Sequence, residues 1–148
     1  MKDDASPAPQ RAPWHLWLVG IVGLLFNSVG AFDYLMTQTQ NQSYMGRFTS
    51  EQLEVLYDFP TWLVAFWALA VWGGALGTLL VLLRKSLAVP VLLVSLLAMI
   101  ITAIHNFFSA NGLYETGGTG VGFVLLIFAL ALGVWLYARA LDERGVLV

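Results

Sequence analysis

Four long runs of apolar residues alternate with short polar segments along the chain. The runs cover about residues 14–36, 60–83, 87–108 and 120–140. At 1.5 Å of rise per residue, each run is long enough as a helix to cross a hydrocarbon layer about 30 Å thick. The pattern therefore predicts an all-α, polytopic membrane protein with four transmembrane helices.

The segments between the runs predict how these helices are arranged. Arg84, Lys85 and Ser86 alone join the second run to the third, so these two helices are expected to be antiparallel neighbours. A glycine-rich turn at residues 109–119 joins the third run to the fourth. Such connections favour an up-down-up-down bundle. Residues 1–13 are predicted to form a disordered tail, and residues 141–148 are predicted to form a short tail.

The one long loop, residues 37–59, carries a helix start signal. Thr49 followed by Gln52 matches a capping box, and Phe48 and Leu53 take the two positions of a hydrophobic staple around it. A short helix over residues 50–58 would have one apolar and one acidic side, as expected of a helix lying on the outer membrane surface. The alternative is an ordinary solvated loop with an isolated cap.

The first run has a competing interpretation as a signal peptide. Lys2 and Arg11 would form its basic region, and the small residues at 29–31 would form its cleavage site. This interpretation is less favoured, because the run is longer than the apolar region of a signal peptide and further spans follow it.

Composition narrows the class of protein further. Hydrophobic residues make up 59% of the 148 residues and charged residues only 11%, which does not suit the surface of a soluble domain. A net charge of -2 without a long basic run gives no sign of nucleic-acid binding. The chain has no cysteine, which excludes disulfides, thiolate metal sites and thiol catalysis.

The basic residues predict the orientation. Six of the seven lie on one side of the predicted bundle, namely Lys2, Arg11, Arg84, Lys85, Arg139 and Arg144, and only Arg47 lies on the other. Cytoplasmic segments of membrane proteins carry the excess of Lys and Arg. Both termini are therefore expected in the cytoplasm, with the long loop outside.

Small residues mark the helix faces expected to pack together. Gly23, Gly30 and their neighbours Asn27 and Tyr34 recur at three- and four-residue steps and form one stripe of the first helix. In the second helix, Gly73 and Gly77 form a small-xxx-small match. Contact within the bundle is the favoured role of all four glycines, ahead of a dedicated dimer interface.

Five polar residues in the outward halves of the first and third helices are the candidate binding residues, and we predict that they line one pocket between these helices. They are Asn27, Asp33, Tyr34, His105 and Asn106. A carboxyl group inside a membrane is a candidate functional group, and a histidine paired with it would titrate near neutral pH. The alternatives are that Asn27 joins helices, that Asp33 is an interfacial anchor and that His105 donates to a backbone carbonyl.

No motif of a known catalytic or metal site is present, so neither a catalytic residue, a metal site nor a cofactor is predicted. His15, the only other histidine, lies at the opposite end of the bundle from His105, so one chain offers no pair of axial haem ligands. Nucleophile elbows, phosphate loops and H-E-x-x-H are missing from the sequence. An enzyme is the least favoured class.

Three stretches, at residues 26–39, 48–62 and 71–96, together resemble a group of small bacterial four-helix membrane proteins often labelled "sugar transporter". The resemblance covers roughly residues 14–110 and implies a multi-pass location in the bacterial inner membrane. The resemblance also implies, as a hypothesis, that the protein transports a solute.

Two functions from different classes remain open. The first is a non-enzymatic accessory protein that binds a membrane-protein partner or assists assembly through its helix faces and outer loop. The second is an oligomeric transporter or channel for a small polar solute, lined by the five polar candidates. Because four helices leave little room for an alternating-access path, the second function requires a homo-oligomer.

Overall fold

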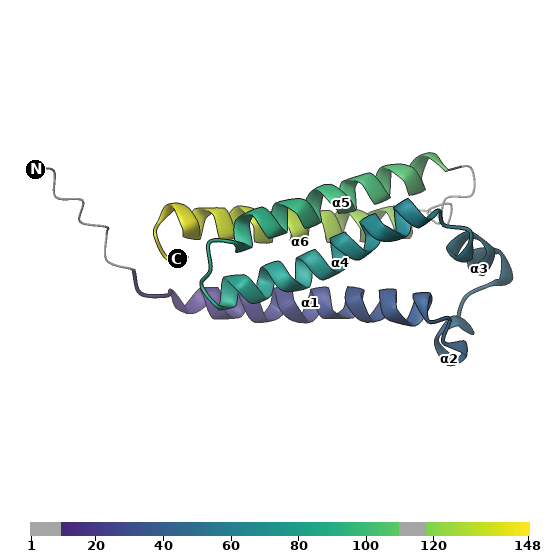
Figure 1. Ribbon diagram of the computed structural model, residues 1–148, viewed down its shortest axis with the longest axis horizontal. Coiled ribbons are helices and arrows are strands. Elements are labelled where there is room, and N and C mark those ends of the chain that lie inside the picture. The colour runs from purple at the N-terminus through teal and green to yellow at the C-terminus, as the bar shows by residue number, and fades with distance from the viewer. Residues whose placement is uncertain (1–9, 110–117) are drawn as a thin grey trace, which may run out of the picture.

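The computed structural model describes residues 10–109 and 118–148, and helices dominate these residues (Figure 1). The elements are α1 (Trp14–Gln38), α2 (Gln42–Met45), α3 (Ser50–Tyr57), α4 (Thr61–Leu82), α5 (Ala88–Phe108) and α6 (Gly118–Glu143). Four of them, α1, α4, α5 and α6, are long and apolar enough to cross a membrane. The predicted fold class is confirmed, and the chain is a multi-pass membrane protein.

The helix bounds differ from the predicted spans by a few residues at most ends. The largest difference is at α6, which continues to Glu143 rather than ending at residue 140. Residues 1–9 of the predicted disordered tail and residues 110–117 of the predicted glycine-rich turn lie outside the described residues.

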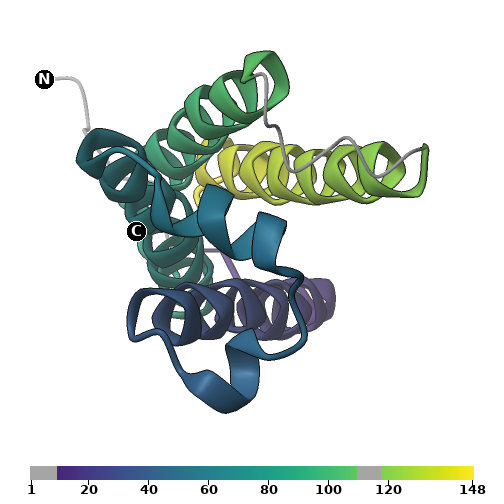
Figure 2. The same cartoon turned by 90° about the vertical axis from the view of Figure 1, so that its right-hand side faces the viewer.

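α4 is the central one of the four long helices. α1 packs against α4, α4 packs against α5, and α5 packs more loosely against α6 (Figures 1 and 2). Gln10, the turn between α4 and α5, and Val148 lie at one end of the bundle, which we name the terminal end. α2 and α3 lie at the other, which we name the loop end.

Glycines let α4 occupy this central position. A Cβ atom added at Gly77 would lie 2.5 Å from Cγ and Cδ2 of Leu92 in α5, so only glycine fits this contact. A Cβ atom at Gly73 would lie 3.1 Å from Cβ of Ser95. The Ser95 hydroxyl also donates to the Ala70 carbonyl at 2.5 Å, which joins α5 to the backbone of α4.

The glycine stripe of α1 faces the same central helix. A Cβ atom at Gly23 would lie 3.1 Å from a methyl group of Thr78, and one at Gly30 would lie 3.5 Å from Val71. The four glycines assigned to packing from the sequence therefore all lie at contacts within the bundle. Such close backbone approach is how helices associate in lipid, where little hydrophobic driving force acts between them.

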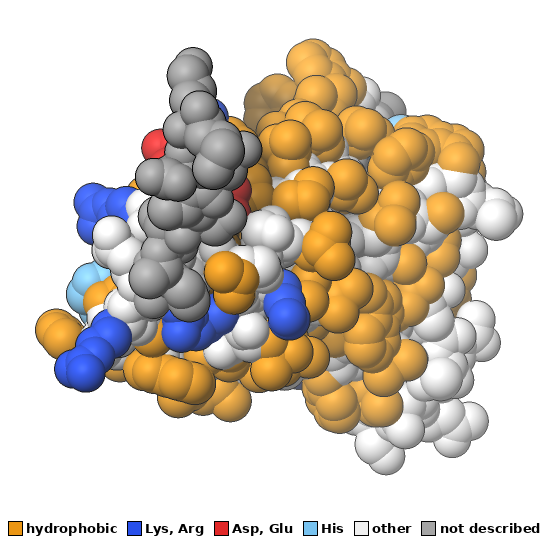
Figure 3. Space-filling view, turned by 60° about the vertical axis from the view of Figure 1, so that its left-hand side comes forward, with side chains coloured by type: hydrophobic (Ala, Val, Ile, Leu, Met, Phe, Trp, Pro, Cys, Tyr) orange, Lys and Arg blue, Asp and Glu red, His pale blue; other side chains and the backbone are white. Residues whose placement is uncertain are grey.

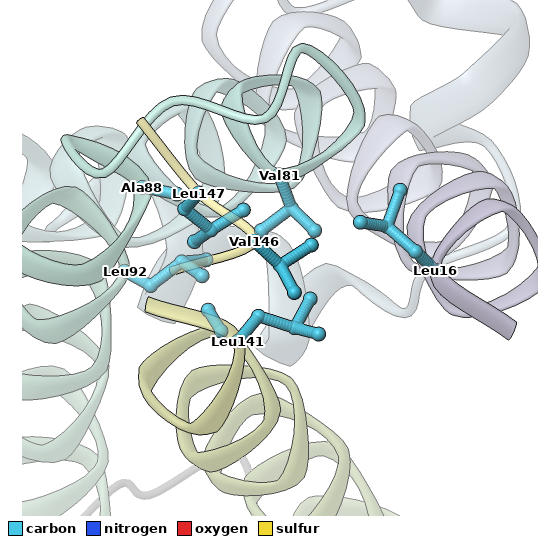
Figure 4. Close-up of a cluster of buried hydrophobic side chains, with 8 residues drawn as sticks. Leu16, Val81, Ala88, Leu92, Leu141, Val146 and Leu147 are labelled. Carbon is cyan, nitrogen blue, oxygen red and sulfur yellow. The ribbon is translucent and has the colours of Figure 1, made fainter. Parts of the chain in front are cut away.

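A cluster of buried side chains closes the terminal end (Figure 4). Its members come from all four long helices and from the residues after α6: Leu16, Val81, Ala88, Leu92, Ala138, Leu141, Val146 and Leu147. The residues predicted to be a short tail after residue 140 are therefore part of the core. The loop end has no comparable cluster among the described residues.

Three helices end in the same way. After α1, α4 and α6 the chain turns through a residue with positive φ, namely Gln40 (50°), Arg84 (57°) and Gly145 (69°). In each case the next residue donates its N–H to the carbonyl five residues earlier, as in a Schellman motif. Glycine is the usual residue at this position, and a side chain there costs about 1–2 kcal/mol. Arg84 and Gln40 are therefore strained positions.

The short helix predicted in the long loop is present. α3 begins at Ser50, where Thr49 N donates to Gln52 Oε1 at 3.0 Å and Gln52 N donates to Thr49 Oγ1 at 3.3 Å, so the capping box is confirmed. α2 was not predicted, because a four-residue helix shows no hydrophobic periodicity. Its N-cap is Asn41, whose side chain accepts from Tyr44 N. That α3 lies on the membrane surface stays a prediction.

Candidate functional site

Asn27, the deepest of the five predicted binding residues, is used in packing. Its Nδ2 donates to the Gly23 carbonyl at 2.8 Å, within its own helix. Its Oδ1 lies directly against Gly74 of α4, where a Cβ atom would collide with it. This geometry fits the joining of two helices, which was the alternative to ligand binding considered for Asn27.

Asp33 lies at the loop end of α1 and its partners come from the segment that follows that helix. The Tyr44 hydroxyl donates to Asp33 Oδ1, and Arg47 Nη2 lies 3.6 Å from the same oxygen. The Asp33 side chain is 42% exposed, so the carboxylate is at a helix end rather than deep in the bundle. The arrangement fits the interfacial anchor considered for Asp33.

Aromatic rings complete this cluster. The Arg47 guanidinium lies over the Tyr44 ring, 3.6 Å from its centroid, and 5.2 Å from the centroid of Phe48. Phe32 of α1 meets the Tyr44 ring edge to face at 5.7 Å. A cation over an aromatic face is attracted by the ring quadrupole. The Asp33, Tyr44 and Arg47 cluster therefore ties α2 to the end of α1.

The other predicted residues have different neighbours. Tyr34 packs edge to face against Trp67 of α4, with centroids 5.0 Å apart. His105 meets Trp62 in the same way at 5.1 Å, and its Nδ1 is buried without a hydrogen-bond partner. Asn106 is buried, with 7% of its surface exposed. Tyr34 of α1 and His105 of α5 therefore contact the loop end of α4 from its two sides.

Asp33 and His105, considered as a possible pair from the sequence, do not pair in this structure. α4 separates α1 from α5, so the outward ends of the first and third spans do not meet. Asp33 is bonded to Tyr44 and Arg47, and His105 Nδ1 has no partner. The five residues therefore do not line one pocket between α1 and α5. The sequence prediction missed Tyr44 and used Arg47 only to assign orientation, although they lie 11 and 14 residues beyond Asp33 in the chain.

The described helices α5 and α6 enclose an apolar groove at the loop end. Ile104, Phe107 and Phe108 of α5 face Val121 and Leu125 of α6 across it. Its volume is about 250 Å³, smaller than the 300–1,000 Å³ typical of ligand pockets. We interpret the groove as loose packing of α6 rather than as a small-molecule site.

α6 differs most from the other spans. In its most apolar window of 18 residues only 6% are buried, against 22% to 28% in α1, α4 and α5. Its buried residues, Ala138 and Leu141, both lie in its last two turns. A Cβ atom at Gly122 or Gly133 would meet nothing within 4 Å. The face of α6 that carries these two glycines is therefore not packed against any other described helix.

The surroundings of Tyr44 in the Asp33, Tyr44 and Arg47 cluster should shift the pKa of its hydroxyl measurably. Burial raises the pKa of Tyr44 above its ordinary value of 10.0, and the hydrogen bond and charge of Asp33 raise it further, while Arg47 lowers it. Asp33→Asn should therefore lower the pKa of Tyr44. Because the folded-state pKa is the raised one, the tyrosine's contribution to stability is complete below the unfolded-state value and is lost as pH rises through the folded-state value.

The titration of Tyr44 is isolated by subtracting the tyrosinate absorbance of Tyr44→Phe from that of the parent. The same subtraction is repeated in the Asp33→Asn background. An unchanged Tyr44 titration in that background would show that Asp33 does not hold this hydroxyl.

No protein-family model, curated protein or solved structure matches this chain. The resemblance to four-helix proteins labelled "sugar transporter" therefore stays a prediction.

Proposed function

We propose that this protein is a non-enzymatic accessory protein of the bacterial inner membrane that binds another membrane protein through α6. The observation that carries the proposal is the low burial of this helix, in which only 6% of the most apolar 18-residue window is buried. Lipid also covers apolar helices, so exposure alone does not distinguish a lipid-facing helix from a partner-binding one. The distribution of small residues on α6 does favour a partner.

Three small residues lie on the exposed side of α6. Gly122, Ala129 and Gly133 fall within about 40° of one another around the helix, and Leu126 borders them, about 20° beyond Gly133. We name these four residues the glycine face. Glycine in a helix costs about 0.5–1 kcal/mol relative to alanine, and at Gly73 and Gly77 of α4 a close neighbour explains it. On α6 the corresponding neighbour would be a helix of another chain, because a lipid tail gains nothing from glycine.

The proposed orientation places the terminal end in the cytoplasm. Lys and Arg side chains gather at this end, while the rest of the visible face is largely hydrophobic (Figure 3). The described basic residues there are Arg11, Arg84, Lys85, Arg139 and Arg144. At the loop end Arg47 is paired with Asp33. This asymmetry supports a cytoplasmic terminal end by the positive-inside rule.

The alternative, an oligomeric transporter or channel for a small polar solute, has less support. Its proposed lining residues are engaged in packing or in ion pairing, as Asn27 and Asp33 show. The hydroxyls of Thr78 and Thr102 donate to carbonyls of their own helices. Among the described residues, α4 lies between the lining candidates of α1 and those of α5.

A photo-crosslinking amino acid at Leu126, in native membranes, tests the proposal. We expect one discrete protein adduct, because Leu126 borders the small residues of the glycine face and lies one turn from Gly122. Gly133→Leu should reduce the adduct at least tenfold, since a large side chain would hold a partner backbone away, yet it should leave the fold intact.

The control position is Leu97 of α5, which has a similar exposure to lipid, 50% against 53% for Leu126. The same crosslinker there should give no discrete protein adduct. Equal adducts at both positions, no adduct at Leu126, or an adduct insensitive to Gly133→Leu would each contradict binding through this face.

A further inference from the structure

The chain after α6 folds back over the terminal end. Gly145, with φ of +69°, reverses its direction, and Val146 N donates to the Leu141 carbonyl. Val146 and Leu147 are then buried, with 3% and 4% of their surfaces exposed, among residues of α1, α4 and α5 (Figure 4). We name residues 145–148 the C-terminal strap.

Backbone hydrogen bonds hold the strap along the turn between α4 and α5. Val148 N donates to the Arg84 carbonyl at 2.7 Å, and Ser86 N donates to the Val148 carbonyl at 3.2 Å. The two partners, Arg84 and Ser86, are the residues before and after Lys85. Val148 therefore lies beside Lys85, with the hydrogen-bond pattern of two parallel strands.

Arg84 connects the strap to a third segment. Its Nε donates to the Val146 carbonyl at 3.0 Å and its Nη2 donates to the Gln10 carbonyl at 2.6 Å. Arg84 occupies a left-handed position where glycine is usual, and its side chain explains why arginine is there instead. One residue thus joins the segment before α1, the α4–α5 turn and the strap.

Away from the strap, two contacts join α6 to α1, and both lie in the terminal half of α6. His15 and Tyr137 are hydrogen-bonded, and Val134 approaches Gly23. Toward the loop end, the groove beside Ile104 and Phe107 separates α6 from α5. Figure 2 shows α6 diverging from α1 in this direction.

We propose that the C-terminal strap is a latch that fixes the terminal end of α6 to the other three helices, so that α6 pivots there while its loop half moves. Arg84 is the positioning residue that holds the latch closed. The latch goes beyond the proposed function, because it concerns the attachment of α6 and not its partner. Releasing it would change the direction in which the glycine face points.

A disulfide measures latch closure directly, since the chain has no cysteine of its own. Lys85→Cys combined with Val148→Cys should crosslink rapidly in purified protein in nanodiscs. Arg84→Gly should slow this crosslinking about tenfold, because it removes both guanidinium hydrogen bonds while relieving the strained backbone. Arg84→Asn, which also tolerates the left-handed conformation, should do the same.

Gln40→Gly is the matched control. It relieves the same backbone strain at the end of α1 but lies away from the strap, so the crosslinking rate should equal that of the parent. Circular dichroism should show an intact helical fold in all variants. Parent-like crosslinking in Arg84→Gly and Arg84→Asn, or slowing by Gln40→Gly as large as by these, would overturn the latch.

This measurement needs no partner, so it separates the latch from the proposed function. Absence of the adduct at Leu126 would contradict partner binding and leave the crosslinking result unaffected. Conversely, unchanged crosslinking would remove the latch even where the adduct forms.

Discussion

Gly77→Leu is expected to prevent stable packing of α4 against α5. Even a Cβ atom at this position would lie 2.5 Å from two carbons of Leu92, which is itself buried. Overpacking of a close-packed site typically costs about 1–3 kcal/mol, and a whole leucine side chain against the buried Leu92 should cost at least about 3 kcal/mol. Unfolding by SDS titration in mixed micelles measures the loss.

Gly133→Leu is the matched control, because a Cβ atom there would meet nothing within 4 Å. Its unfolding midpoint should equal or exceed that of the parent, since glycine is the poorer helix former. Similar losses in the two variants would show that the glycines of α4 are no more closely packed than those of α6.

Leu147→Asp is expected to be the most destabilising change in the C-terminal strap. The Leu147 side chain is 4% exposed in the cluster that closes the terminal end. Truncation of a buried leucine costs about 2–5 kcal/mol, and an unpaired carboxyl group in the same place adds to the cost. Thermal unfolding in detergent should show a lowered midpoint, and the 85–148 cysteine pair should lose its crosslink.

Val148→Asp places the same charge one residue later, where the side chain is 62% exposed. It should leave the unfolding midpoint near that of the parent. If Leu147→Asp were equally well tolerated, the strap would not be part of the core.

The spans were predictable from the sequence because a helix in lipid must satisfy its own backbone hydrogen bonds over the membrane thickness. Apolar run length therefore locates α1, α4, α5 and α6 within a few residues. The start of α3 was predictable for a similarly local reason, since Thr49 and Gln52 satisfy the first free N–H groups of that helix. Both signals depend only on neighbours in the chain.

The polar contacts were not predictable, because they depend on which helices are adjacent and how each is rotated. Similar depth in the membrane made Asp33 and His105 look like partners. The close approach of Gly73 and Gly77 to α5 places α4 between them. Asp33 instead takes Tyr44 and Arg47, which follow it closely in the chain.

The strap did leave a signal in the sequence that was not used. Gly145 followed by three apolar residues is the pattern of a helix that ends in a Schellman motif and returns an apolar segment to the core. The three charged residues before Gly145, Asp142, Glu143 and Arg144, favoured the interpretation of this segment as a solvated tail. The role of Arg84 was not predictable, because it depends on contacts with Val146 and Gln10, which are separated from it by 62 and 74 positions in the chain.

Firm attachment of α6 at the terminal end, with looser packing of its described loop half, is most directly tested by two distance distributions between spin labels in nanodiscs. One pair, at Leu87 and Glu143, spans α5 and α6 at the terminal end, and the other, at Phe108 and Phe123, spans them at the loop end; all four positions are exposed. We predict a narrow distribution for the terminal pair and a broad one for the loop pair. Equally narrow distributions at both ends would contradict the account.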